Sequence, residues 1–459
     1  MGETVLNDHD ALGNLLCQYG SAAHPVGFDY DTRGRMNALG TTREGDAWDV
    51  TSWIYDRATG LVGSKVHADD SVVSYAYTPD GKPLRTTWAR GAWRENAYNA
   101  NGLLAGVSYS DATPAVSLDY DAFQRLASAS NGVAAYTYGN SALGVATNET
   151  ATLGGDVWTL TRRLDGRHRL AGMSLSPASQ GGGAAPYSVA YGYDTEGRLA
   201  AVSNEVFAVS YAFSYRGLDA GYSLALTNGV SLNRALARNG WRHELVRRVT
   251  NATSTGWTNT LNYAYDDAGR VTARNADTFG YNARSEVTNA TLGAINYAYA
   301  YDHIGNHTAS SVDSATTIYE ANSLNQYTTI DTITPSYDAD GNMTWDGRFS
   351  YAYDAENRLI AAYSNTVCIV SNAYDHASRR VLKWTPCHTT TFVYDGWLPI
   401  LEIIATASEV ATNAYVWGKD LSGTLQGAGG VGGLLAVSLN LKRAVELSSY
   451  HPEHHLVAF

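Results

Sequence analysis

The 459-residue chain has few cysteines, few prolines and no long apolar run, and each shortage excludes a class of protein. It contains 10 Pro and 3 Cys. An odd number of cysteines without CxxC spacing defines neither a disulfide framework nor a zinc site. We therefore expect small buried side chains at Cys17, Cys368 and Cys387. No window holds the roughly 18 apolar residues of a membrane-spanning helix, so no membrane span is predicted.

Positive charge is also scarce. The chain has 32 Lys and Arg against 44 Asp and Glu, a net charge of −12. Phosphate binding requires a basic surface, so we expect neither a nucleic-acid partner nor an anionic-membrane partner. Two local basic stretches, 162–169 and 238–248, lack regularly interleaved aromatic residues and are predicted to be solvated strand faces. Residues 1–20 lack the pattern of a signal peptide, which leaves the location of this chain unknown.

Tyrosine and glycine are abundant instead. The chain has 32 Tyr, 11 Trp and 44 Gly, and 44% of its residues are hydrophobic. This content is sufficient for a sizeable core, and aromatic residues punctuated by glycine favour strands and turns over helices. The composition therefore predicts an all-β protein.

A short pattern, aromatic-x-Tyr-Asp-x-x-Gly-Arg-Leu, recurs along the whole chain. Clear copies are "FDYDTRGRM" (28–36), "YGYDTEGRL" (191–199) and "YAYDAENRL" (351–359), and degenerate copies such as "RRLDGRHRL" (162–170) and "FSYRGL" (213–218) fill the longer gaps. We predict that the repeated residues form structural turns at Tyr30, Asp31, Tyr55, Asp56, Tyr120, Asp121, Tyr193, Asp194, Gly197, Tyr265, Asp266, Gly269, Tyr301, Asp302, Gly305, Tyr337, Asp338, Gly341, Tyr353, Asp354, Tyr374, Asp375, Tyr394 and Asp395.

Each repeat is predicted to be a β-hairpin. In "VAYGYDTEGRLAAVS" (189–203), large side chains alternate with small ones, which is the period of a half-buried strand. Asp194 suits the first position of a type I turn and Gly197 the fourth. A single hairpin cannot bury its aromatic face, so the hairpins are expected to stack into one continuous antiparallel sheet. A long twisted sheet must curl, which predicts a wound or spiralling shell.

The repeats set the expected domain organisation. Residues 1–437 are predicted to form one repetitive β-shell, with a Gly/Ser/Pro-rich loop insertion at about 176–186. Residues 438–459 contain no repeat and are expected to be a C-terminal tail that is disordered or outside the family pattern.

The units resemble the YD repeats of the RHS/YD-repeat family, which includes polymorphic toxins, insecticidal toxin-complex cocoon proteins and teneurins. The resemblance covers about residues 20–437, and "YEANSLNQYTTI" (319–330) and "YVWGKDLSGTLQGAGGVGGLLAV" (415–437) strengthen it. It implies a β-shell around a hollow interior, which in toxins encloses a C-terminal effector released by self-cleavage. The Asp-Pro-x-Gly motif of that cleavage is missing from the sequence, so an incomplete family member is expected, without self-cleavage or toxicity.

Several shorter motifs resemble functional sites but fit structural roles better. Asp338-x-Asp340-Gly341 begins like a calcium loop, yet position 12 of that loop is Phe349 instead of the required Glu. "HELVR" (243–247) lacks the second histidine of a zinc-binding HExxH motif. "GAGGVG" (427–432) matches GxGxxG without a βαβ unit around it. "YHPEHH" (450–455) is expected to be tail. Cys387-His388 would point to opposite faces of a strand.

The sequence therefore predicts no catalytic residue, no cofactor and no metal site. The leading hypothesis is a non-catalytic structural shell segment that encloses or presents an effector polypeptide in a full-length parent. The alternative is a secreted or cell-surface protein whose aromatic residues bind carbohydrate or another cell. Both hypotheses place the full-length parent outside the cell or on its surface.

Overall fold

Strands joined by turns and loops make up the residues that the computed structural model describes, which are 4–43, 47–177, 187–439 and 445–447. Every strand pairs antiparallel with the next one along the chain, except that β30 and β31 do not pair. No helix long and apolar enough to cross a membrane occurs within these ranges. The predicted all-β fold of repeated antiparallel hairpins is confirmed.

Thirty strands form a first sheet, the outer sheet. They are β1 (Leu6–His9), β2 (Leu15–Tyr19), β3 (Val26–Tyr30), β4 (Met36–Thr41), β5 (Asp49–Tyr55), β6 (Val62–Val66), β7 (Val72–Tyr77), β8 (Pro83–Thr87), β9 (Trp93–Tyr98), β10 (Leu104–Tyr109), β11 (Val116–Tyr120), β12 (Leu126–Ser130), β13 (Ala134–Asn140), β14 (Ala146–Leu153), β15 (Asp156–Leu164), β16 (Leu170–Pro177), β17 (Tyr187–Tyr193), β18 (Leu199–Ser203), β19 (Phe207–Phe213), β20 (Asp219–Leu226), β21 (Ser231–Arg238), β22 (Val246–Thr253), β23 (Thr258–Tyr265), β24 (Val271–Arg274), β25 (Asp277–Tyr281), β26 (Val287–Leu292), β27 (Ile295–Tyr301), β28 (His307–Val312), β29 (Ala315–Ala321) and β30 (Tyr327–Ile330).

Eleven strands form a second sheet, the inner sheet. They are β31 (Ser336–Tyr337), β32 (Met343–Trp345), β33 (Phe349–Tyr353), β34 (Leu359–Ser364), β35 (Val367–Tyr374), β36 (Arg380–Trp384), β37 (Thr389–Asp395), β38 (Leu398–Ala405), β39 (Val410–Trp417), β40 (Leu434–Leu439) and β41 (Val445–Leu447).

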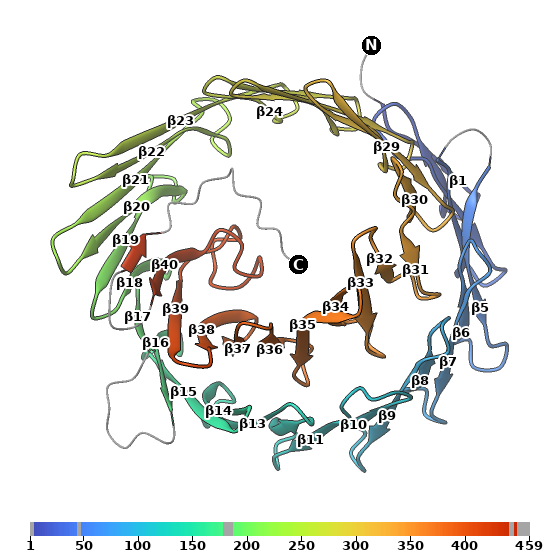
Figure 1. The fold of residues 1–459 in the computed structure, drawn as a ribbon, viewed down its shortest axis with the longest axis horizontal. Coiled ribbons are helices and arrows are strands. Elements are labelled where there is room, and N and C mark those ends of the chain that lie inside the picture. Colours follow the sequence, from blue (N-terminus) through green and yellow to red (C-terminus); the bar gives the residue numbers. More distant parts are fainter. Residues whose placement is uncertain (1–3, 44–46, 178–186, 440–444, 448–459) are drawn as a thin grey trace.

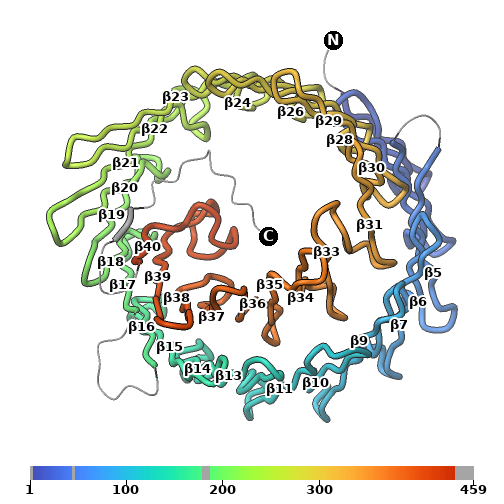
Figure 2. The backbone as a smooth tube through the Cα atoms, in the orientation of Figure 1, coloured from blue at the N-terminus to red at the C-terminus, as the bar shows by residue number. Residues whose placement is uncertain are grey.

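The two sheets follow one coil. The outer sheet curls into a ring, and after β30 the chain turns inward so that the inner sheet follows the inside of that ring (Figures 1 and 2). Early in the coil, His24 contacts His303, which lies 279 residues further on. Late in the coil, Tyr211 contacts Lys419, only 208 residues further on. The number of residues needed to complete one turn therefore decreases along the coil, as in a tightening spiral.

The repeat turns lie on one edge of the sheets. Because consecutive strands are antiparallel, the turns that follow odd-numbered strands share an edge, which we call the YD edge, and the other connections share the opposite edge. Where the coil overlaps itself, the YD edge of the later turn meets the opposite edge of the earlier one. The Arg90 main-chain N–H, between β8 and β9, donates to the carboxylate of Asp340 at 2.9 Å. The Asn131 amide, between β12 and β13, donates to the Tyr374 carbonyl at 2.9 Å.

The repeated aspartate organises each turn through hydrogen bonds to the main chain. In the copy at 194–198, the Asp194 Oδ1 accepts the N–H of Arg198 at 2.8 Å, and Gly197 has a φ of 86°, a left-handed conformation that glycine adopts without strain. Gly269, Gly305 and Gly341 also have positive φ. The same aspartate-to-backbone bond, to the fourth residue after the aspartate, occurs at Asp31, Asp121, Asp266, Asp302, Asp338, Asp354 and Asp375.

Two copies of the turn differ in detail. The turn at Asp56 is one residue longer, and its carboxylate accepts the N–H of Thr59 at 2.7 Å. Asp395 ends strand β37 and pairs with Leu398 across the two-residue turn Gly396-Trp397. Its carboxylate pairs with Arg162 of β15 at 2.6 Å.

The repeated tyrosine links each hairpin to the preceding one. The Tyr193 hydroxyl donates to the Leu170 carbonyl at 2.9 Å, which lies just after the preceding turn. Such bonds satisfy the polar end of a ring whose body is packed on the sheet. The equivalent bonds join Tyr30 to Leu15, Tyr55 to Met36, Tyr120 to Leu104, Tyr265 to Val246, Tyr301 to Val287, Tyr337 to Tyr327, Tyr353 to Met343, Tyr374 to Leu359 and Tyr394 to Arg380.

The repeated arginine completes the link in the other direction. Arg169 donates from Nε to the Asp165 carboxylate at 2.8 Å, and its guanidinium lies 4.1 Å from the centre of the Tyr193 ring in the next repeat. Arg35 does the same with Asp31 and Tyr55. The consensus Tyr-Asp-x-x-Gly-Arg-Leu thus encodes both the turn and its attachment to its neighbours.

We expect the tyrosine ladder to contribute measurably to stability. A Tyr353→Phe variant loses only the hydrogen bond to the Met343 carbonyl, so the free energy of unfolding should fall by about 1 kcal/mol. The control is Tyr363→Phe on β34, a half-buried tyrosine outside the ladder, which should change stability less. Urea unfolding followed by tyrosine and tryptophan fluorescence compares the two variants, and equal midpoints would contradict a role for the ladder.

The main core lies where the inner sheet covers the outer sheet face to face. Strands β36–β40 pack on β13–β21, and the residues between them include the most completely buried side chains of the molecule. These include Leu175, Val202 and Val209 from the outer sheet and Val381, Ile400 and Leu401 from the inner sheet.

The predicted boundaries meet this fold at two places. The boundary after residue 437 falls inside β40, and β40 pairs with β41, so the sheet continues to Leu447. Of the predicted loop at 176–186, only Ser176 and Pro177 are described, at the end of β16. Residues 450–455, including His451, Glu453, His454 and His455, lie outside the described residues. The division into domains stays a prediction.

Candidate functional site

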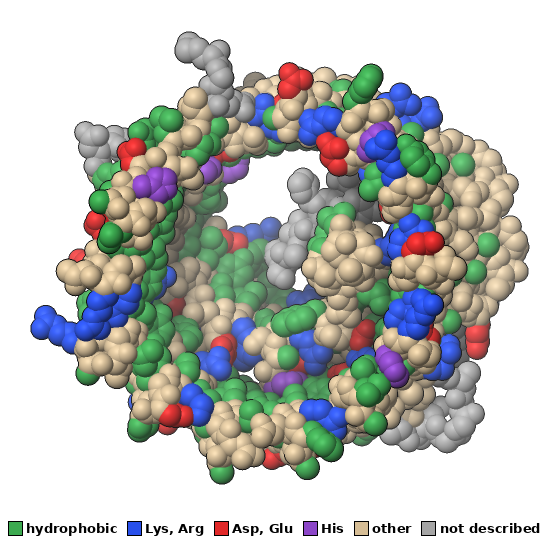
Figure 3. Space-filling view, turned by 180° about the vertical axis from the view of Figure 1, so that it is seen from behind, with side chains coloured by type: hydrophobic (Ala, Val, Ile, Leu, Met, Phe, Trp, Pro, Cys, Tyr) green, Lys and Arg blue, Asp and Glu red, His purple; other side chains and the backbone are tan. Residues whose placement is uncertain are grey.

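The concave face of the coil carries the repeated tyrosines. Tyr136, Tyr187 and Tyr191 of the outer sheet are buried in the core against the inner sheet, so they point into the ring. The repeat tyrosine Tyr193, two residues after Tyr191 on β17, also packs against this core. Because the sheet is continuous and the repeat tyrosine occupies the same position in every hairpin, the other repeat tyrosines share this face. Figure 3 shows the molecule in space-filling form with a hollow at its centre. The repeat residues therefore line the inside of a hollow ring.

Charged and polar side chains join the successive turns of the coil. Arg90 forms an ion pair with Asp340, with 2.5 Å between Nε and Oδ2. The Glu356 carboxylate accepts the Tyr109 hydroxyl at 2.7 Å and pairs with Arg94 at 3.2 Å. Burial, followed by this bond to Glu356, raises the pKa of Tyr109. Asp340 and Glu356 lie two positions after the repeated aspartate, where other repeats carry different residues. The turn itself therefore does not require a carboxylate at this position.

The most deeply buried of these contacts centres on Asp375. Its side chain is 0% exposed. It accepts the main-chain N–H of Arg379 at 2.9 Å, the Arg379 Nε at 2.7 Å and the Tyr136 hydroxyl at 2.9 Å. Burial, then the charge of Asp375, raises the pKa of Tyr136, so this tyrosine stays protonated as a donor. At Asp121 the same turn motif is partly exposed to solvent. At Asp375 it connects the inner sheet to the outer sheet through the bond to Tyr136.

His376 gives this cluster a pH dependence. Its ring lies edge-on to Tyr136, with 5.1 Å between ring centres, and its Nε2 is 3.4 Å from the Tyr138 hydroxyl. Burial lowers the pKa of His376 below 6.5, against a smaller opposing effect of Asp375, while Arg379 lowers it further.

We expect the stability of the protein to fall as the pH falls through about 6.5. Below that pH the unfolded chain binds a proton at His376 that the folded chain binds only at lower pH, so protonation favours unfolding. Urea midpoints measured from pH 7.5 to 5 should therefore decline less in a His376→Gln variant than in the wild type. An identical decline in both proteins would contradict this assignment.

Arg162 forms a second largely buried contact between the two sheets. Its side chain is 12% exposed and pairs with Glu149 at 3.0 Å and with Asp395 of the inner sheet at 2.6 Å. These two carboxylates keep the pKa of Arg162 raised despite its burial. The prediction that the stretch 162–169 is a solvated strand face is wrong at this residue, because the inner sheet covers it. The sequence between 162 and 169 contains no sign of that covering layer.

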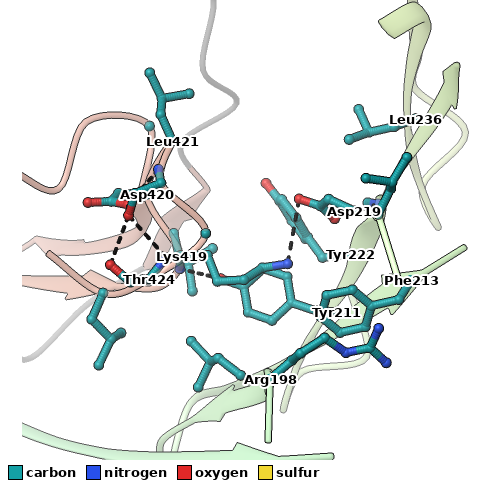
Figure 4. Close-up of a pocket in the computed structure, with 18 of the residues that line it drawn as sticks. Arg198, Tyr211, Phe213, Asp219, Tyr222, Leu236, Lys419, Asp420, Leu421 and Thr424 are labelled. Carbon is teal, nitrogen blue, oxygen red and sulfur yellow. Dashed lines mark hydrogen bonds and ion pairs between the residues drawn. The ribbon is translucent and has the colours of Figure 1, made fainter. Parts of the chain in front are cut away.

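A cavity lies at the seam where the inner sheet meets the outer wall. It has a volume of about 900 Å³, and its walls come from β17–β21 and from the glycine-rich loop 418–433 between β39 and β40 (Figure 4). This loop occupies the place of a repeat turn on the YD edge. We call the cavity the seam cleft.

Lys419 anchors the loop to the outer wall. Its ammonium lies 4.1 Å from the centre of the Tyr211 ring and 4.4 Å from that of Phe213, and it pairs with Asp219 at 3.5 Å (Figure 4). Burial lowers the pKa of Lys419, and the charge of Asp219 opposes that effect. The preceding Gly418 lies against the Tyr211 hydroxyl, where an added Cβ would come within 1.9 Å of the oxygen. Only glycine fits at this position without a shift of its neighbours.

Asp420 fills the interior of the glycine-rich loop. Its carboxylate accepts main-chain N–H groups from Ser422 at 2.9 Å, Ala428 at 2.6 Å and Gly430 at 3.2 Å. Burial raises the pKa of Asp420, but the hydrogen bond from the Ser422 hydroxyl and then these main-chain bonds lower it below its usual value. A phosphate-binding loop requires free N–H groups, and here a side-chain carboxylate takes two of those within 427–432. This arrangement agrees with the structural interpretation of "GAGGVG".

The other motifs lie in structural positions. Asp338 and Asp340 belong to a YD turn, and "HELVR" (243–247) spans the connection and start of β22. Among the described residues, no group of three or more His, Cys, Asp or Glu is arranged to hold a metal ion. The prediction of three buried cysteines is wrong for Cys387, which is exposed, and Cys17 and Cys368 are half-buried.

Comparisons with known proteins agree with this geometry. The Teneurin YD-shell family model matches residues 264–395. The tRNA nuclease WapA of Bacillus subtilis (strain 168) is 31% identical over 126 residues, which cover 26% of this chain and 5% of WapA. The tRNA(Glu)-specific nuclease WapA of Bacillus subtilis subsp. natto is 31% identical over 99 residues, or 21% of this chain and 4% of that protein. This chain thus spans about one twentieth of the length of these relatives.

Solved structures share the fold over most of this chain. The Tc holotoxin pore of Photorhabdus luminescens with a mutated TccC3 matches with a TM-score of 0.73 and 15% identity, over 90% of this chain and 25% of that chain. The crystal structure of TcdB2-TccC3 matches equally well, with a TM-score of 0.73 and 15% identity, over 90% of this chain and 26% of that one. The fold is therefore that of a YD-repeat shell. Residues 264–395 also match the family model of the teneurin shell, so the repeats and the fold are similar to those of RHS/YD-repeat proteins.

Proposed function

We propose that this chain is a non-catalytic segment of an RHS-type shell that encloses or presents an effector polypeptide in a full-length parent. The observation that carries the proposal is the hollow, tyrosine-lined inner face of a coil whose hairpins are joined without a break from β1 to β30. A wall of this kind surrounds an interior on its sides (Figures 1 and 3), and a polypeptide enclosed in a longer parent would lie within it. The likeness in fold to chains of Tc toxin structures supports the same role.

The use of the buried charges supports a role without catalysis. Arg162, Asp375 and Arg379 are buried, and each is paired with a side chain that belongs to the architecture of the coil. Catalytic groups need access to a substrate, whereas these groups face one another between sheets. The nuclease activity in the name of WapA belongs to that protein. We place the full-length parent outside the cell or at its surface, on the basis of the family resemblance.

A protection experiment tests the shell function. In Figure 1, β1 lies on the outer wall, whereas β40 lies inside the ring. The same unstructured 30-residue peptide tag is fused before Met1 in one variant and after Phe459 in another, and both are treated with proteinase K. We expect the C-terminal tag to be digested several-fold more slowly than the N-terminal tag. Equal digestion rates would contradict enclosure of a C-terminal polypeptide.

Exposed aromatic side chains favour a second candidate function, the binding of carbohydrate or another cell. Tyr215 is 89% exposed and Trp241 is 95% exposed. They lie on neighbouring turns of the YD edge, about 10 Å apart by strand spacing, and aromatic rings of this kind stack on sugars. A glycan array tests this candidate with the wild type and Trp241→Ala. Binding that the substitution abolishes would support it, and absence of binding would count against it.

A further inference from the structure

The seam cleft combines uncompensated positive charge with an aromatic wall. Four of its lining side chains are cationic, namely Arg198, Arg234, Arg238 and Lys419, against the carboxylates of Asp219 and Asp420. This surplus lies in a chain with a net charge of −12, so it is contrary to the charge of the molecule as a whole. The partners of each cation show which side chains carry the unpaired positive charge.

Two of the four cations are used by the structure. Arg198 pairs with Asp194 at 2.7 Å, as in other repeats, and Lys419 pairs with Asp219 at 3.5 Å. The Asp420 carboxylate is occupied by N–H groups of its own loop. Arg198 and Lys419 are therefore not available as the main contact for a ligand.

The other two arginines have no carboxylate partner among the described residues. Arg234 makes a single long hydrogen bond of 3.4 Å to the side chain of Asn251. Arg238 donates only to main-chain carbonyls, those of Asp219 at 2.8 Å, His243 at 3.2 Å and Glu244 at 3.3 Å. These bonds hold Arg238 in place and leave its charge unpaired. Arg234 retains free donors that can bind an anion through two parallel hydrogen bonds.

The wall beside these arginines suits a flat apolar group. The Tyr211 and Tyr222 rings meet edge to face, with 6.1 Å between their centres, and Leu236 and Leu421 line the same cavity (Figure 4). Within the described part of the chain, the Tyr222 hydroxyl has no hydrogen-bond partner. A cavity of about 900 Å³ falls in the size range of small-molecule sites, which is about 300–1,000 Å³.

We infer that the seam cleft binds a small organic anion that carries a flat ring, with its anionic group on Arg234 and its ring between Tyr222 and Leu236. The site joins the outer wall to the last loop of the inner sheet. Leu421 of the loop lines the same cavity, so a bound ligand would lie between the two layers and hold the loop 418–433 against the wall. This site is independent of the proposed enclosure of a polypeptide.

The probe for this site is 1-anilinonaphthalene-8-sulfonate, a ring-bearing anion whose fluorescence rises on binding. We expect saturable binding to the full chain and an affinity about tenfold or more weaker in Arg234→Gln, because a hydrogen-bonded contact to a charged group is lost. Arg167→Gln removes an equal charge from an exposed turn outside the cleft and should leave the affinity unchanged. Naphthalene-2-sulfonate should displace the probe at least tenfold better than neutral 2-naphthol.

A second variant keeps the test valid if Arg234→Gln folds poorly. Leu236→Trp retains both arginines and fills the cleft with a larger side chain, so it should also weaken binding about tenfold. Circular dichroism confirms the fold of each variant. The inference is overturned if Arg234→Gln and Leu236→Trp bind the probe as tightly as the wild type. It is equally overturned if Arg167→Gln weakens binding as much as Arg234→Gln, or if 2-naphthol competes as well as the sulfonate.

Discussion

An Asp375→Ala variant is expected to unfold at a markedly lower urea concentration than the wild type. The substitution removes an acceptor that is 0% exposed and leaves the Arg379 guanidinium, 7% exposed, without its ion-pair partner. Removing one member of a buried ion pair lowers the free energy of unfolding by about 3–5 kcal/mol, because the remaining charge stays desolvated. The Tyr136 hydroxyl loses its acceptor in the same step.

The matched control is Asp121→Ala. Asp121 has the same turn role, with Arg125 as its partner, but its side chain is 26% exposed on the YD edge. Water can solvate the groups that this substitution frees, so we expect a much smaller loss of stability. Midpoints from urea unfolding, followed by fluorescence and by circular dichroism, give the comparison. Equal losses in the two variants would show that Asp375 acts only as a turn residue.

An Ile400→Ala variant is expected to weaken the packing of the inner sheet on the outer sheet. Ile400 is 0% exposed in the core shared by the two sheets. Truncating a buried isoleucine removes apolar contacts and leaves a cavity, which lowers the free energy of unfolding by about 2–5 kcal/mol. Because the core joins strands far apart in sequence, the loss should also speed cleavage of the inner sheet by a protease.

Ile54→Ala serves as the control for this prediction. Ile54 lies on the outer sheet with 57% of its surface exposed, and substitutions at such sites usually change stability by less than about 0.5 kcal/mol. Chemical unfolding and limited proteolysis with thermolysin should both separate the two variants. If Ile54→Ala were as damaging as Ile400→Ala, the packing of the two sheets could not be the source of the effect.

The hairpins and their turns could be predicted from the sequence because their causes are local. Asp194 and Gly197 are close in the chain, and residues within a single repeat set the turn conformation. The degenerate copy at 162–170 forms a turn of the same kind, with His168 at positive φ in the place of glycine. The curling of the sheet also follows from general properties of strands.

The burial of each repeat turn could not be predicted, because it depends on which turns of the coil lie against one another. Asp121 and Asp375 occupy the same position of one motif, yet the first is partly exposed and the second is buried. Their difference arises from strands that are 239 residues apart, as the bond from Tyr136 to Asp375 shows. The sequence around Arg162 predicts a solvated face for the same reason, since the strand that covers it lies far away in the chain.

The seam cleft also could not be predicted from the sequence. Arg234 and Lys419 are separated by most of the second half of the chain, and no motif connects them. The only available signal was that the stretch 238–248 and the nearby Arg234 are basic in an acidic chain. That signal indicates charge without indicating which layer covers it. The glycine-rich segment 427–432 matches a binding motif, but two of its N–H groups donate to Asp420 of the same loop.

A disulfide trap tests the coil itself most directly. The Thr113 hydroxyl accepts the main-chain N–H of Ala355 at 2.9 Å, although 242 residues separate them. With Cys17, Cys368 and Cys387 replaced by serine, a Thr113→Cys and Ala355→Cys variant should form an intramolecular disulfide on mild oxidation, detected by mass spectrometry of the peptides. A Thr113→Cys and Ala268→Cys control should remain reduced. Failure of the first pair to form a disulfide in the folded protein, or equal formation in both, would contradict a sheet that coils once around its own interior.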